Sequence, residues 1–97
     1  MLDLVIRTFA DKRTERLFNR EPVREFAAIA WVALRRLFAL DSATRLTDLL
    51  IPPGNRLEML TGDRKGQHSI RVNDQYRICF TWRDGNAEDV EISKHYR

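Results

Sequence analysis

The most constraining feature of this sequence is a change in the spacing of its apolar residues at Pro52-Pro53-Gly54-Asn55. Before this segment the apolar residues recur every three or four positions, which is the period of a helix that buries one face. After it they alternate with polar residues, which is typical of strands with one face in water. Because proline and glycine end regular structure, we place the boundary between a helical part and a sheet part here.

Two helices are expected in the first half of the chain. Asp11 is a suitable N-cap for a helix that runs to about residue 20. Pro22 fits the first turn of a second helix, for which we expect residues 22–40. The polar face of this helix carries Arg24, Glu25, Arg35 and Arg36. Its wide apolar face consists of Val23, Phe26, Ala27, Ala30, Ala33, Leu34, Leu37 and Phe38.

Strands are expected on both sides of these helices. Residues 4–9 form a short apolar run, which predicts a first strand covered on both faces. After the boundary, alternation predicts strands around residues 57–59, 67–72, 75–82 and 90–92, and Asn73-Asp74 is a hairpin signal. The order β-α-α-β-β-β, with a further strand near the end, predicts an α+β domain whose two helices pack on one face of an antiparallel sheet.

Composition limits the classes of protein that this chain can represent. Its 97 residues suit one domain over 1–97, and 43% hydrophobic with 32% charged residues indicates a folded protein. We expect a cytoplasmic protein with no membrane contact, because no apolar run is long enough for a membrane span or a signal peptide. No metal-ligand spacing or nucleotide loop is present, so no metal and no cofactor are expected. Cys79 is expected to be a buried, inert thiol, and Trp31 and Trp82 to be packing residues.

The alternation in the sheet part sorts its side chains onto two faces. The expected helix-covered face consists of Ile70, Val72, Tyr76, Ile78 and Phe80. The opposite face collects Glu58, Gln67, Ser69, Arg71 and Arg77. An ordinary solvated face would also alternate in this way. However, guanidinium groups beside a carboxylate suit a phosphodiester, because the cations neutralise phosphate oxygens and the carboxylate can accept a proton.

Other candidates have both a structural and a functional interpretation. His68 alternates with core residues, which favours a structural histidine over a proton shuttle. His95 and Tyr96 lie at the end of the chain, where a frayed tail is common, although an aromatic and a histidine are unusual in one. The glycine-flanked Asp63-Arg64 is either a simple turn or a loop that faces a phosphate.

The order of residues between positions 52 and 82 is distinctive. Its segments are Pro52-Pro53-Gly54-Asn55-Arg56-Leu57-Glu58, Gly62-Asp63-Arg64, Gly66-Gln67-His68-Ser69-Ile70-Arg71-Val72-Asn73 and Gln75-Tyr76-Arg77-Ile78-Cys79-Phe80. This block resembles the HigB (killer-protein) branch of the RelE/ParE toxin superfamily, and the layout of the whole chain is similar to that family. The resemblance implies a compact RelE/ParE fold, cleavage of mRNA on the ribosome, and neutralisation by a HigA-type helix-turn-helix antitoxin. It also implies that operator DNA is bound only through the antitoxin.

The resemblance further implies site residues for a metal-free cleavage, in which the ribose 2′-hydroxyl attacks the adjacent phosphate. Arg77 matches the arginine expected at the scissile phosphate, and Glu58 stands where some members have a histidine, so its carboxylate is a candidate base. Tyr96 matches the tyrosine of the usual C-terminal Asp-Tyr-His. Here the tail reads His95-Tyr96-Arg97, which leaves the acid and the base open, with His95 as a candidate substitute.

The expected phosphate-binding and RNA-binding residues are Arg56, Arg64, Lys65, Arg71, Lys94 and Arg97. Two alternatives to an endonuclease remain open. The altered tail is compatible with a ribosome-binding or RNA-binding module that does not cleave, and ParE toxins of the same fold inhibit DNA gyrase. Glu58, Arg77 and Tyr96 on one surface would favour the endonuclease.

Overall fold

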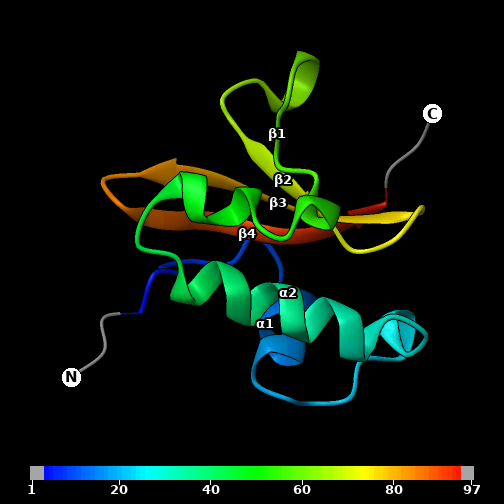
Figure 1. The fold of residues 1–97 in the computed structure, drawn as a ribbon. Coiled ribbons are helices and arrows are strands. Elements are labelled where there is room, and N and C mark those ends of the chain that lie inside the picture. Colours follow the sequence, from blue (N-terminus) through cyan, green and yellow to red (C-terminus); the bar gives the residue numbers. More distant parts are fainter. Residues whose placement is uncertain (1–3, 95–97) are drawn as a thin grey trace.

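The second half of the chain forms a four-stranded antiparallel sheet in a computed structural model that describes residues 4–94. The strands follow each other in space as in the sequence, in the order β1-β2-β3-β4. Their bounds are Glu58–Met59 for β1, His68–Arg71 for β2, Tyr76–Arg83 for β3 and Asn86–Lys94 for β4. The helices α1 (Lys12–Phe18) and α2 (Ala30–Ser42) lie together on one side of this sheet (Figure 1). The predicted fold class, an α+β domain with two helices on one face of an antiparallel sheet, is therefore confirmed.

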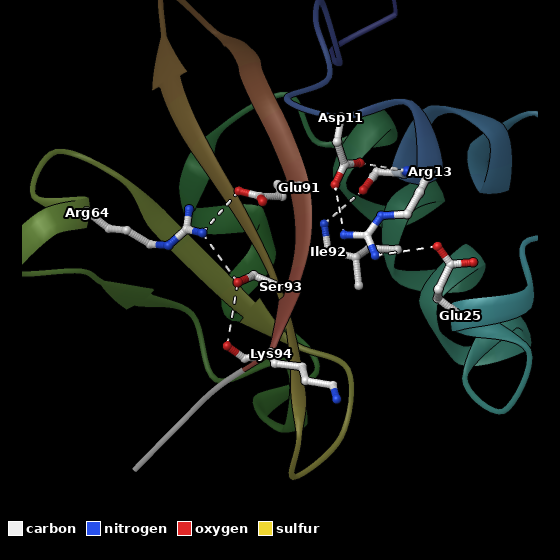
Figure 2. Close-up of polar contacts among 9 residues, drawn as sticks. Asp11, Arg13, Glu25, Arg64, Glu91, Ile92, Ser93 and Lys94 are labelled. Carbon is white, nitrogen blue, oxygen red and sulfur yellow. Dashed lines mark hydrogen bonds and ion pairs between the residues drawn. The ribbon is translucent and has the colours of Figure 1, made fainter.

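Helix α1 begins where the sequence predicts. The carboxylate of Asp11 accepts a hydrogen bond from the backbone N–H of Thr14 at 2.8 Å, which satisfies one of the free donors of the first turn. The hydroxyl of Thr14 in turn accepts the backbone N–H of Ile92 at 3.0 Å, so α1 is attached directly to β4. Figure 2 labels Asp11, which caps α1, and Ile92 of β4.

The second predicted helix, residues 22–40, is wrong over residues 22–29. A 3₁₀ turn (η1, Arg24–Phe26) comes first, and α2 begins only at Ala30. In one continuous helix Ile29 would point about 100° away from the middle of the apolar face, because each residue turns the helix by about 100°. The break before Ala30 allows Val23, Phe26 and Ile29 all to be buried.

The N-terminal segment is also less regular than predicted. Residues 4–9 are not a strand of the sheet; they lie parallel to the free edge of β4 and make only two isolated bridges, Ile6 with Ala87 and Phe9 with Val90. Between these bridges Asp89 has a φ of 53° and donates its N–H to the Thr8 hydroxyl rather than to a backbone carbonyl. This local irregularity of β4 interrupts the ladder.

The core lies between α2 and the sheet. All of the predicted helix-facing residues except Tyr76 are buried, and Tyr76 is half-buried with its ring 6.1 Å from that of Phe26. Ala33, Leu37 and Leu40 of α2 are fully buried against this face. Trp82 packs against the core as predicted, but the prediction for Trp31 is wrong, because this residue is 71% exposed. No helix within residues 4–94 is both long enough and apolar enough to span a membrane.

The predicted boundary between the two parts is a 3₁₀ turn, η3 (Pro53–Asn55). Asn55 is buried, and its side-chain amide donates to the carbonyl oxygens of Leu49 at 3.2 Å and Ile51 at 3.3 Å. These bonds hold the end of the helical part against the chain that enters β1. The turn thereby sets where the first strand of the sheet begins.

Candidate functional site

Arg77 lies on the face of the sheet that the helices leave uncovered. Its Nη1 atom donates to Glu58 Oε2 at 2.8 Å and to Ser69 Oγ at 3.0 Å. The three residues come from β3, β1 and β2, and the register that places Glu58 opposite Ser69 brings them together. The predicted neighbourhood of Glu58 and Arg77 is confirmed, while their chemical roles remain predictions.

The environment of this pair is asymmetric. The residue Arg77 is only 9% exposed, whereas about half of the Glu58 side chain faces solvent. A buried guanidinium needs a counter-ion, because removing its charge from water is costly unless an opposite charge and hydrogen bonds replace the lost hydration. Glu58 and Ser69 provide these contacts. The cluster thus offers an anion-binding group directly beside a proton acceptor.

A cavity of about 320 Å³ opens beside the pair. Its walls come from β1, from the following loop with the 3₁₀ turn η4 (Gly62–Arg64), and from Arg77. The Asp63-Arg64 pair, which the sequence left as either a turn or a phosphate-facing loop, lines this cavity. The loop therefore forms one wall of the candidate site.

Arg64 connects that loop to β4, the strand at the other end of the sheet from β1. Its Nη2 atom donates to Glu91 Oε1 at 3.0 Å and to Ser93 Oγ at 3.3 Å, and its Nη1 atom donates to Gln67 Oε1 at 3.0 Å. Figure 2 shows the Arg64 side chain reaching across to these two residues of β4. Sequence reasoning missed Glu91 and Ser93; their alternation with the buried Ile92 was the available signal.

Cys79 lies on this same face, between Ser69 and Glu91 in the register. It is buried, and this burial raises the pKa of its thiol above the usual value, although the charge of Arg64 opposes the shift. The neutral thiol is therefore favoured, which agrees with the expected inert cysteine. His68 is half-buried with its ring stacked 6.1 Å from that of Phe80, as the structural interpretation predicts.

The other predicted RNA-binding residues are spread more widely. Arg71 is opposite Arg77 in the register and forms an ion pair with Asp74 at 2.6 Å. Arg56 and Lys65 are exposed, at the C-terminal end of η3 and next to η4. Lys94 does not join Arg77, because it is opposite Tyr76 in the register and its ammonium lies 5.9 Å from the Tyr76 ring, on the helix-covered side.

The predicted tail residues, His95, Tyr96 and Arg97, lie outside the described residues. Within residues 4–94, no group of three or more His, Cys, Asp or Glu side chains is placed to hold a metal ion. The described part of the site consists of a guanidinium, a carboxylate, a hydroxyl and the loop that walls the cavity beside them.

Comparison with known proteins extends this picture to the whole chain. A family model described as "RelE-like toxin of type II toxin-antitoxin system HigB" matches residues 7–95. The chain belongs to this HigB family of RelE-like toxins. Toxin HigB-1 of Vibrio cholerae serotype O1 is 42% identical to this toxin over 89 residues, which are 90% of this chain and 94% of that one. A Haemophilus influenzae protein is 31% identical over 64 residues, which cover 66% of this toxin and 63% of that protein.

A solved structure supports the fold of this HigB-family toxin independently. A chain of the YoeB-YefM complex from Staphylococcus aureus superposes with a TM-score of 0.61 at 21% identity, over 98% of this toxin and all of that chain. The likeness shows a shared RelE-like fold. The family model and the 42% identical toxin confirm the resemblance found in the sequence. As a toxin of a type II toxin–antitoxin system, the protein has an antitoxin as its partner.

Proposed function

We propose that this HigB-family toxin is a ribosome-dependent mRNA endonuclease of the cytoplasm that is neutralised by a HigA-type antitoxin. The observation that carries the proposal is the nearly buried Arg77, bonded to Glu58 and Ser69 at the edge of a cavity. Such a group binds a phosphate without metal, because a preoriented guanidinium stabilises the charge that develops on the phosphate oxygens. Operator DNA is bound only through the antitoxin.

Glu58 then becomes the base when RNA binds. A phosphate that takes over the Arg77 contact releases the Glu58 carboxylate beside the ribose. The carboxylate accepts the 2′-hydroxyl proton, the 2′-oxygen forms a bond to phosphorus, and the bond from phosphorus to the 5′-oxygen breaks, which leaves a cyclic phosphate. The leaving 5′-oxygen takes a proton from an acid, for which Tyr96 and His95 of the tail are the candidates.

Other cationic side chains bind the rest of the mRNA. Arg56, Lys65 and Arg71 are the expected contacts to the RNA backbone, and Arg64 supplies a further guanidinium at the wall of the cavity that Arg77 also lines. Lys94 would engage RNA only where it passes the end of β4, and Arg97 remains an expected RNA contact outside the described residues. Contacts of this kind depend strongly on salt, because each phosphate that is neutralised releases counterions.

Replacing Arg77 tests the proposal directly. The Arg77→Ala protein should cleave mRNA on programmed ribosomes about 10²–10⁴-fold more slowly, because removing a group that acts in the transition state has costs of this size. Arg83→Ala is a matched control on the same strand, since Arg83 is exposed and forms its ion pair with Glu88. Primer extension on a defined message measures both. Undiminished cleavage by the Arg77→Ala protein would remove the central residue of this mechanism.

The unmodified protein separates the remaining functions. Ribosome binding without any cleavage would support the non-catalytic module, and inhibition of DNA supercoiling by gyrase would support a ParE-like activity. Either result would reject the endonuclease.

A further inference from the structure

An apolar groove of about 600 Å³ lies between α1, the turn that follows it, and the outer side of α2. Its apolar wall includes Leu17, Pro22, Trp31, Leu34 and Phe38. We call it the α1–α2 groove. Trp31 is 71% exposed there, although tryptophan carries one of the largest apolar surfaces of any side chain. An exposed large aromatic beside an apolar groove is typical of a protein-binding anchor site.

The charges in the groove are mainly positive. Arg20 and Arg35 line it together with a single carboxylate, Glu21. Arg20 stacks over the Phe38 ring at 5.3 Å, and neither arginine forms an ion pair with a residue of the described part, 4–94. The groove thus combines an apolar wall with two guanidinium groups that lack carboxylate partners there.

We propose that the α1–α2 groove binds an acidic amphipathic segment of the antitoxin, an inference that rests on the proposed neutralisation of this toxin by its antitoxin. An amphipathic helix places apolar side chains at every third or fourth position, which suits a groove with Trp31 and Leu34 as anchors. Carboxylates along its edge would pair with Arg20 and Arg35. RNA satisfies only the second half of this description, because a phosphate backbone leaves the apolar wall unfilled.

The groove and the candidate catalytic surface lie on different sides of the molecule. The groove is lined by residues of the helical layer, which covers one side of the sheet (Figure 1). Arg77, bonded to Glu58 and Ser69, belongs to the opposite face of the sheet. A segment in the groove therefore leaves the Arg77 cluster unfilled and keeps the antitoxin attached independently of it. Binding of the antitoxin and cleavage of RNA are then separable by substitution.

The test measures the affinity of the purified antitoxin encoded next to this toxin. Trp31→Ala should weaken binding by about 30-fold or more, the loss expected for an anchor residue. Arg35→Glu should also weaken it, and more strongly at low salt, because the charge pairing is exposed. Ile51→Ala is the matched control, since Ile51 is an equally exposed apolar residue outside the groove, and it should change the affinity less than twofold.

Growth assays give the second measurement. The Trp31→Ala toxin should still arrest growth, and the co-expressed antitoxin should no longer restore growth. The Arg77→Ala toxin should bind the antitoxin normally but should not arrest growth. Wild-type affinity in the Trp31→Ala protein would overturn the groove alone. If the Trp31→Ala protein lost ribosome binding but still bound the antitoxin, the groove would be an RNA contact, and this result would also overturn the proposal. Failure of the unmodified toxin to bind the antitoxin would reject the proposed neutralisation itself.

Discussion

Cys79 belongs to the candidate surface by register but is shielded from solvent, because it lies in the region that Arg64 spans. Burial raises the pKa of its thiol, so the reactive thiolate is scarcer in the folded protein than in the unfolded chain. Alkylation by iodoacetamide at mildly alkaline pH should therefore be much slower in the native protein. Mass spectrometry of native and denatured samples measures the two rates. Equal rates would contradict the burial.

The same shift gives the sign of a pH effect on stability. The folded protein holds the Cys79 proton more tightly than the unfolded chain does. The stability that the folded protein gains by holding this proton is fully present below the unfolded pKa of the thiol. It is lost as the pH rises through the raised folded pKa. Cys79→Ser provides the control, because a serine does not titrate in this range.

Individual site residues differ in how far the sequence could place them. A strand period of two fixes the face of a side chain, which is why Glu58 and Arg77 were predicted to be neighbours. Glu91 and Ser93 depend on the register of β4, which shifts between Cys79 and Thr81. The contact of Arg64 depends on the path of the loop before β2, and no short-range pattern encodes such a path.

At the scale of elements, one carboxylate attaches the N-terminal segment to α2. Asp41 Oδ1 accepts the backbone N–H groups of Val5 at 3.0 Å and Ile6 at 2.9 Å. Asp41→Ala should destabilise the protein by about 1–3 kcal/mol, because donors that lose their acceptor in a partly buried place retain their desolvation cost. Asp41→Asn keeps an acceptor oxygen and should cost less. Urea unfolding midpoints compare the two, and equal losses would show that the negative charge matters more than the acceptor.

Capping explains why the second helix was predicted too long. Ile29 precedes α2 and offers no side-chain cap, so the sequence contained no start signal at Ala30, whereas Pro22 gave a false one. The strands, in contrast, were bounded by clear turn residues. The strands predicted at residues 67–72 and 75–82 were therefore placed correctly, whereas the last strand, predicted at 90–92, runs from Asn86 to Lys94. Elements that depend on tertiary burial, such as η1 and the segment at residues 4–9, were not placed correctly.

At the scale of the whole molecule, the two sides of the helical layer have different contacts. Their inner sides close the core against the sheet, and their outer side carries the α1–α2 groove. An antitoxin bound there stabilises the folded state by mass action, because it binds the native surface and not the unfolded chain. The uncovered face of the sheet remains available for the Arg77 cluster.

Phe26 shows how strongly the helical layer depends on the sheet. Its ring packs at 6.1 Å against the Tyr76 ring of β3, and the Arg13 guanidinium of α1 lies 5.1 Å from its centre, so one buried side chain joins three elements. Phe26→Ala should destabilise the protein by about 3–5 kcal/mol, since a buried phenyl leaves a cavity that the core fills only partly. Leu34→Ala is the control: sequence periodicity put Leu34 on the same face, but the structure places it half-buried in the groove. Its loss in thermal and urea unfolding should be clearly smaller, and an equal loss would mean that Leu34 belongs to the core and that the groove is not an open surface.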